Sequence, residues 1–330
     1  MRKLQYIYNK YKRSSTMQSS HVMRRATIAD YDEILSIIPS SQYEGDFLPD
    51  YFHMLMSNPL YDAVVYVVNG KIIGHSAIFV IDGGTTGVMR CGRIRKEYQE
   101  KGILRELGTE LLRLHPMVQR SVSATATNIH LIKNKIDSGF FKLLTIRKCI
   151  FYSGYKNRIS NIVPTIRSNQ LTTVLQECDL TKMIREHTSY PHVFEDDGLV
   201  IDSVPYKLME SNVPIILMER TRAVVSYLED KNRTLLTFGS YFRLPNGDMF
   251  CKLDIYGTVC KILSTHISLH LQTFWSKIED RFTIEARFKT FSDIIDHSMH
   301  EIGLTNVSVG TTKRTDIYCV EMSNDVPSKL

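Results

Sequence analysis

The chain has 330 residues, of which 43% are hydrophobic and 23% charged, values that are ordinary for a folded protein and exclude a wholly disordered or fibrous one. Because one domain usually takes about 100–200 residues, this length favours two domains. The first 20 residues hold five basic and no acidic residues, which leaves 36 basic against 35 acidic residues in the rest, so the folded part lacks the basic excess of a nucleic-acid binder.

Two further features bear on where the chain works. The six cysteines show no Cys-x-x-Cys spacing, which favours free thiols in a reducing compartment. No apolar run approaches the ~18 residues that a membrane span needs, and the N-terminus has no secretory hydrophobic segment. We therefore expect a cytoplasmic protein without nucleic-acid or membrane partners, in which residues 1–22 form a basic disordered tail. A mitochondrial presequence is the alternative interpretation of that tail.

Residues 23–155 alternate between strand and helix signals and predict a first domain. Runs of β-branched residues that end at Asn69-Gly70 and at Asp82-Gly83-Gly84 favour an antiparallel meander. Apolar residues at helical spacing, with Pro39 and Gly139 as stops, predict the helices between and after the strands. The expected order is strand 23–27, helices 30–38 and 49–56, strands 63–68, 71–81 and 87–94, helix 104–114, strand 118–124, helix 129–136 and a closing strand.

A similar order of elements returns after residues 156–193, which read as a partly helical linker. The predicted second domain, 194–325, has strands at 198–204, 223–228, 235–243 and 249–256, a helix at 259–278, a strand at 282–288, a helix at 291–302 and strands near 307 and 317. The order of its elements predicts that the second half is a degenerate copy of the first.

The polar segment 93–104 leads from a predicted strand into a predicted helix. A pyrophosphate needs backbone N–H groups that converge at a helix N-terminus, and Gly102 lets the backbone come close to such a group. Arg95, Lys96 and Lys101 add positive charge around it. An ordinary strand-to-helix turn with solvated charges is the alternative that these residues leave open.

The same segment resembles the cofactor motif of the GCN5-related N-acetyltransferases (GNAT), in which Gln or Arg is followed by two residues, Gly, one residue, and Gly or Ala. A hydrophobic residue, Ile94, stands five positions before the motif as the family has it, whereas Leu104 departs from the pattern. The matching positions are Gln99, Glu100, Lys101, Gly102 and Ile103.

This resemblance implies acetyl-CoA as the co-substrate, bound without a metal by the motif residues together with Ile94, Arg95 and Leu104. It also implies an α/β (α+β) fold, with a mixed, mostly antiparallel sheet flanked by helices and a second, degenerate GNAT-like half. The family holds its acyl-CoA in a splay between the fourth and fifth strands, which would place the thioester near residues 91–93. An amine then attacks the thioester directly, without an acyl-enzyme.

A second family element follows the predicted strand 118–124. Asn128 and Gly139-Phe140 match it, which implies that Asn128 contacts the pantetheine region, but Lys135 stands where the family has a Tyr that protonates the leaving thiolate. Three possibilities remain open: Lys135 donates that proton, another Tyr does, or water does.

Within the superfamily, the layout resembles that of the histidine N-acetyltransferases, on three stretches: 46–50, 202–206 and 253–257. The resemblance implies an acceptor pocket next to the loop between the first two helices. There Glu44 and Asp46 are candidates for the base, and Tyr51 and Tyr256 are candidates for flanking an imidazole ring.

Three functions remain open: acetylation of a free amino acid, with the α-amine of L-histidine first; acetylation of another small amine or a protein N-terminus; and acyl-CoA binding without catalysis. His266 and His270 have the i, i+4 spacing of two metal ligands, but without a third ligand we expect buried or surface histidines and no metal. Two similar halves can cover each other's sheet edges, so we expect a monomer.

Overall fold

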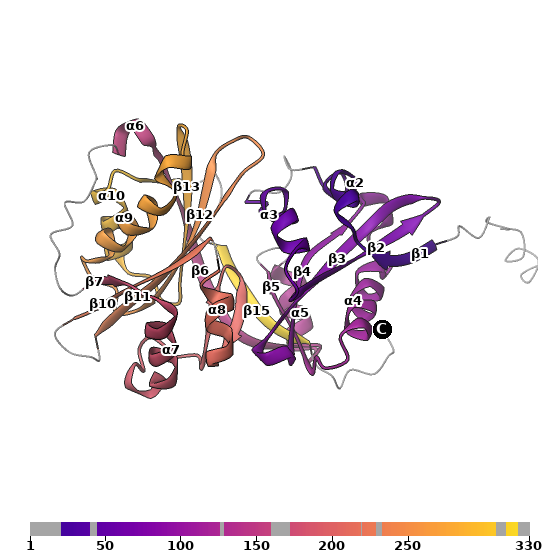
Figure 1. Ribbon diagram of the computed structural model, residues 1–330, viewed down its shortest axis with the longest axis horizontal. Helices are drawn as coiled ribbons and strands as arrows, with labels where there is room; N and C mark the ends of the chain where they lie inside the picture. Colours follow the sequence, from indigo (N-terminus) through magenta and orange to yellow (C-terminus); the bar gives the residue numbers. More distant parts are fainter. Residues whose placement is uncertain are drawn as a thin grey trace, which may run out of the picture.

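The computed structural model describes residues 21–39, 45–125, 129–159, 172–218, 220–228, 233–307 and 315–322. Over these residues, thirteen strands form one continuous mixed sheet that runs through both halves of the molecule, with helices on its two faces (Figure 1). The strand order is β1-β2-β3-β4-β5-β15-β6-β13-β12-β11-β10-β7, and β14 pairs with β6 outside this path. The predicted fold class is confirmed.

The first half contains the predicted meander, and most expected elements lie within two residues of their predicted bounds. Its strands are β1 (His21–Arg25), β2 (Tyr61–Val68), β3 (Lys71–Ile81), β4 (Thr86–Ile94) and β5 (Arg120–Thr125). Its helices are α2 (Tyr31–Leu35), α3 (Leu48–Met56), α4 (Ile103–Leu114) and α5 (Ile129–Asp137), with short 3-10 turns at Ile28–Asp30, Asp82–Gly84 and Lys96–Tyr98.

Alternation along β2 explains how this part of the sheet carries a core on each face. Val64, Tyr66 and Val68 pack with the buried leucines of α4, whereas Ala63 and Val65 belong to the core on the opposite face. Successive side chains of a strand point to opposite faces, so one apolar strand supplies both cores.

The second half repeats this order. Its strands in the main sheet are β7 (Thr172–Val174), β10 (Thr221–Tyr227), β11 (Thr234–Arg243), β12 (Met249–Gly257), β13 (Arg281–Phe288) and β14 (Thr305–Asn306). Its helices are α7 (Glu177–Arg185), α8 (Val213–Ile216), α9 (Leu263–Phe274) and α10 (Asp293–Glu301), with 3-10 turns at His187–Ser189, Glu210–Asn212 and Trp275–Lys277.

The single strand predicted at 198–204 is wrong. The segment forms a separate hairpin of β8 (Gly198–Ile201) and β9 (Val204–Lys207), with Asp202 and Ser203 at its turn. Their φ angles of 49° and 65° are those of a tight hairpin turn, which usually takes Asn-Gly or Asp-Gly. The sequence lacks that signal, because Ser stands where glycine is usual.

Two strands tie the halves together. The long strand β6 (Phe141–Tyr155) pairs with β15 (Thr315–Met322) through its first part and with β13 through its second part. After β6, the short helix α6 (Lys156–Ile159) follows. At the far end of the chain, β15 returns to the first half and lies between β5 and β6 (Figure 1). The sheet therefore continues through the junction of the halves.

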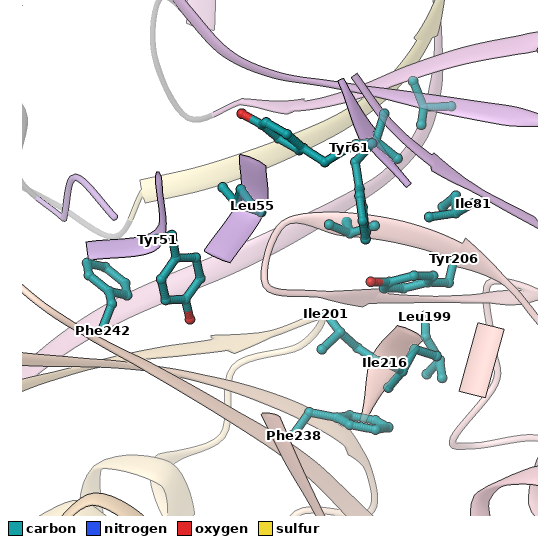
Figure 2. Packing of buried hydrophobic residues seen from close by; sticks show 14 of the residues in the cluster. Tyr51, Leu55, Tyr61, Ile81, Leu199, Ile201, Tyr206, Ile216, Phe238 and Phe242 are labelled. Carbon is teal, nitrogen blue, oxygen red and sulfur yellow. The ribbon is translucent and has the colours of Figure 1, made fainter. Parts of the chain in front are cut away.

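A hydrophobic core also crosses between the halves. Tyr51 of α3 packs edge-on against Phe242 of β11, and its hydroxyl donates a hydrogen bond to the carbonyl oxygen of Tyr241 at 3.1 Å. Figure 2 shows Tyr61 and Ile81 of the first half in the same cluster as Leu199, Ile201 and Tyr206 of the β8–β9 hairpin. This packing fixes the relative position of the two surfaces that face each other between the halves.

Candidate active site

A cleft opens where β4 and β5 separate. The two strands pair in parallel over three residues only, Thr86–Val88 of β4 with Arg120–Val122 of β5. Beyond that point a cavity of ≈ 1270 Å³ extends between them, from the loop before α4 to charged side chains between the two halves. Unpaired parallel strands leave backbone N–H and C=O groups free for a ligand that lies between them.

A bulge in β4 accompanies the separation. Between His75 and Ala77 of β3, the opposing strand β4 advances by three residues, from Arg93 to Arg90, and Cys91 within the bulge has a φ of 56°. The Nδ1 of fully buried His75 lies 2.9 Å from the carbonyl oxygen of Cys91. Burial lowers the pKa of His75 to about 4, so the imidazole is neutral and Nδ1–H donates this bond.

The loop before α4 lines the outer end of the cavity. Gly102 begins the helix with a φ of 79°, and the helix leaves the first backbone N–H groups after it without acceptors in α4. Glu100 also has a positive φ of 63°. Lys101 and Arg105 line the cavity next to them, so the loop combines free amides with positive charge.

Three motif residues brace this loop from behind. The side-chain amide of Gln99 donates to the carbonyl oxygen of Ile94 at 3.2 Å, while Ile94 and Ile103, the first residue of α4, are buried in the core between that helix and the sheet. Arg95 does not line the cavity; its guanidinium donates to the carbonyl oxygen of Ile72 at 2.9 Å and to the hydroxyl of Ser36 at 2.8 Å.

Both departures from the family motif lie on the cavity wall. The side chain of Leu104 is 49% exposed and leans toward Gly92 of β4, across the entrance. Lys135 of α5 lines the cavity as well, and its ammonium stands 5.1 Å from the ring centroids of Phe140 and Phe141. The lysine therefore lies where a group could act on a ligand in the cleft.

The inner end of the cavity contains paired, buried charges. Arg93 donates to Asp46 at 2.6 Å, with side chains that are 7% and 4% exposed. Both residues of a second pair come from β13, where Nε and Nη2 of Arg287 each donate to the carboxylate of Glu285 at 3.0 Å. The remaining Nη1 of Arg287 donates to the hydroxyl of Ser203 at 2.9 Å.

Asp202 bridges the two halves. Its carboxylate accepts from Lys252 of β12 at 2.6 Å and lies 3.4 Å from Arg90 of β4. Both cations also flank the ring of Phe47, at 4.7 Å and 4.8 Å from its centroid. Burial alone would raise the pKa of Asp202, but the attraction of Lys252 and Arg90 outweighs it and leaves that pKa below its ordinary value.

The structure brings six of the candidate residues to one cavity and places others elsewhere. Those on the cavity wall are Asp46, Glu100, Lys101, Gly102, Leu104 and Lys135. Tyr51 lies in the core between the halves, and the hydroxyl of Tyr256 exchanges 2.7 Å hydrogen bonds with the backbone of Val200, so neither lines this cavity. Glu44 and Asn128 lie outside the described residues.

Several cavity residues were missed by sequence reasoning: Arg90, Arg93, Ser203, Lys252, Glu285 and Arg287. Glu285 and Arg287 gave no signal, because they stand at the polar positions of the alternating strand 281–288, whereas Lys252 interrupts the mostly apolar strand 249–257. Charges at such positions are buried and paired more often than by chance, since an unpaired buried charge is costly.

His266 and His270, the two histidines at metal-ligand spacing, are buried in the second half. The hydroxyl of Thr237 lies 2.9 Å from Nδ1 of His266 and 2.8 Å from Nε2 of His270. Among the described residues, no group of three or more His, Cys, Asp or Glu side chains is arranged to hold a metal ion. In that same part of the chain, none of the helices has both the length and the apolar character to cross a membrane.

Comparison with known proteins agrees with this geometry. Residues 168–289 match the family described as histidine N-acetyltransferase, C-terminal. The search of curated protein sequences gave no match.

Two solved structures resemble nearly the whole chain. A tandem GNAT protein from the clavulanic acid biosynthesis pathway aligns with a TM-score of 0.54 and 10% identity over 94% of this chain and all of that one. A putative acetyltransferase from Pyrococcus horikoshii aligns with a TM-score of 0.50 and 14% identity over 95% of this chain and 92% of that one. At these identities the likeness concerns the fold.

The sheet, its helices and the cleft between β4 and β5 give this chain a fold of the GNAT type, as in the tandem GNAT protein. Its two halves both have the GNAT strand order. Over residues 168–289 the chain is similar to the C-terminal part of histidine N-acetyltransferase.

Proposed function

We propose that this protein transfers the acetyl group of acetyl-CoA to the amine of a free amino acid, with the α-amine of L-histidine as the first candidate. The observation that carries the proposal is the single cavity of ≈ 1270 Å³ that joins the Gly102 loop to the buried charges between the halves. A two-substrate transfer needs such a shared space, because the acyl donor and the acceptor have to meet. The name of the matching family supports histidine as the acceptor.

The outer part of the cavity suits the donor. The amides at the start of α4, with Lys101 and Arg105, offer hydrogen bonds and positive charge to a pyrophosphate. Past the loop, the unpaired edge of β4 suits the amides of pantetheine as an added strand would. The bulge at Cys91 then lies on the path toward the inner charges and is a place for the thioester.

The inner part suits the acceptor. The amine nitrogen attacks the thioester carbonyl carbon, the C–S bond breaks, and sulfur leaves with the electron pair while nitrogen loses a proton. Asp46 is our candidate for accepting that proton, since its Oδ2 has no hydrogen-bond partner among the described residues. Lys135 lines the same cavity and is our candidate for protonating or stabilising the leaving thiolate.

The test is incubation of the full-length protein with acetyl-CoA and a panel of the twenty L-amino acids, small amines and a peptide with a free N-terminus, read as release of CoA thiol. We expect release with a narrow set of amino acids, L-histidine among them. Release with the peptide or with simple amines alone would redirect the proposal to those acceptors. Binding of acetyl-CoA without release for any amine would contradict the transferase assignment to this site.

A further inference from the structure

The side chains around the inner end of the cavity hold more positive than negative charge. Four cations line it, Arg90, Arg93, Lys252 and Arg287. Three acids face them, of which Asp46 and Glu285 line the cavity and Asp202 stands behind it. Arg147 and Asp254 are also buried nearby and add one charge of each sign, so the excess of one positive charge persists. Burial raises the pKa of Asp254, which increases the positive excess, whereas it lowers the pKa of Lys252 against the attraction of Asp202 and Glu285.

Each of these three acids is already paired with a cation. Asp46 binds Arg93, Glu285 binds Arg287, and Asp202 binds Lys252 and Arg90. A buried positive charge without a full counter-charge is costly, and a bound anion relieves that cost.

Two of the cations retain hydrogen-bond donors. The ammonium of Lys252 has three N–H groups, and among the described residues it donates one hydrogen bond, to Asp202. The guanidinium of Arg93 has five, and its recorded hydrogen bond there is to Asp46. The rings of Phe47 and Phe242, at 4.7 Å and 5.2 Å, keep the ammonium of Lys252 in place.

The donor substrate does not supply the missing anion. Its phosphates suit the Gly102 loop at the outer end, and a thioester is neutral. Resting on the proposed function, we propose that the acceptor brings a carboxylate, and that Lys252 from the second half, together with Arg93 from the first, binds it between the halves. The second half thereby selects acceptor molecules that carry a carboxylate as well as an amine.

The experiment compares L-amino acids with their carboxamides, which keep the shape and the α-amine but lose the charge. For the best amino acid of the panel, the wild-type protein should prefer the acid over the amide by about 100-fold in kcat/KM, within the range for losing a buried charged hydrogen bond. In Lys252→Met that ratio should fall to about tenfold or less, while Lys252→Arg should retain part of it because a cation remains. Lys289→Met removes a second-half lysine outside the cavity and should leave the ratio unchanged.

A binding measurement separates this inference from the proposed function. If amines are acetylated but acid and amide react equally well, the carboxylate site is wrong and the transferase stands. If no amine reacts, calorimetry with L-histidine and L-histidinamide in the presence of CoA decides. Tighter binding of L-histidine supports the site, and equal or absent binding overturns it.

A variant that fails to fold does not block the test, since wild-type protein answers it too. Imidazole-4-propanoate, which has the carboxylate but no amine, should compete with the amino acid, whereas 4-methylimidazole should compete at least about tenfold more weakly. Equal competition by the two compounds would overturn the inference.

Discussion

The two halves of this molecule share a strand order but differ at the point where a GNAT sheet opens. In the first half, β4 and β5 pair over three residues and then leave a cavity of ≈ 1270 Å³. In the second half, β12 and β13 pair over six residues, Met249–Asp254 with Phe282–Arg287, and the space beside their ends measures ≈ 90 Å³. The same topology therefore holds one open cleft and one closed cleft.

Side chains hold the second cleft closed. The guanidinium of Arg147 donates to the carbonyl oxygens of Ile255 and Arg287, at 2.8 Å and 3.1 Å, and so links the ends of β12 and β13. Nearby, Lys289 pairs with Glu195 and Asp196 of the segment before the β8–β9 hairpin. Backbone groups that a CoA would occupy in the first half are used within the protein in the second.

The comparison shows that the second half has the same strand order but no open cleft of its own, and that it instead lines part of the cavity of the first half. It contributes Lys252, Glu285, Arg287 and, from the hairpin turn, Ser203 to the wall of the open cavity. In the proposed function, the first half supplies the donor cleft and the second half completes the acceptor end. The following predictions test that division of roles.

The largest expected effect lies in the buried histidines of the closed half. Burial lowers the pKa of both His266 and His270 to about 3, whereas an unfolded His has a pKa of about 6.5. Below pH 6.5 the unfolded chain therefore binds protons that the folded chain does not. The free energy of unfolding decreases as the pH is lowered. From pH 7 to pH 5 each histidine should lower the free energy of unfolding by about 2 kcal/mol, and the two together by about 4 kcal/mol.

Urea unfolding at the two pH values measures this loss. The double variant His266→Gln/His270→Gln should show a much smaller pH dependence, because amides keep hydrogen bonds but do not titrate. His192→Gln, at an exposed position, should retain the wild-type dependence. A wild-type protein equally stable at pH 7 and pH 5 would contradict the assignment.

Glycines with positive φ in the two halves should respond differently to alanine. At Gly257, which ends β12, an added Cβ would stand 2.0 Å from the carbonyl oxygen of Thr234. At Gly102 the nearest atom would be 3.8 Å away. We expect Gly257→Ala to lower the free energy of unfolding by about 3 kcal/mol or more and Gly102→Ala by about 1 kcal/mol. Equal losses in a denaturant titration would remove the contrast between a packed turn and an open one.

A carboxylate in the donor loop should weaken acetyl-CoA binding. Gly102→Glu places negative charge where the pyrophosphate is proposed to bind, and we expect at least about 100-fold weaker binding by calorimetry with normal folding. Gly102→Ala controls for backbone strain alone. Lys261→Glu places a carboxylate at the start of the corresponding helix α9 in the closed half and should leave the affinity unchanged. Unchanged affinity in Gly102→Glu would refute the placement of the donor.

The smallest effect concerns Lys135. If its ammonium acts on the leaving thiolate, Lys135→Met should lower kcat by about tenfold or more, with acetyl-CoA affinity nearly unchanged. Lys133→Met, at an exposed position of the same helix, is the matched control. A full rate in the Lys135 variant would exclude this lysine from the mechanism and leave the open cleft as the donor site.

Much of the architecture could be predicted from the sequence because it rests on local signals. Asn69-Gly70 and Asp82-Gly83-Gly84 mark turns, and the meander between them has nearly the predicted bounds. The hairpin at Asp202-Ser203 was missed, because its turn residues carry no local signal and its conformation is fixed by contacts with Asp254, Lys252 and Arg287. Those partners lie 50 or more residues away in the sequence.

The turn before α4 was accessible to sequence reasoning for the same reason. The side chain of Gln99 bonds to the backbone of Ile94 five residues before it, and Gly102 begins the helix three residues after it, so the features of this turn lie within ten residues. The sequence by itself thus determined the order of elements along the chain, the repeated halves and the turn at Gly102 before α4.

Only the tertiary structure decided which cleft is open and which charges meet at the inner end of its cavity. Arg147 closes one cleft by reaching two strand ends that meet only in the folded sheet. The pairing of Arg93 with Asp46 and of Lys252 with Asp202 likewise joins separate elements, and β15 enters the first half from the far end of the chain. Spacing in sequence encodes neighbours along a helix or strand, whereas the charge balance of a buried chamber depends on contacts between distant segments, which only folding brings about.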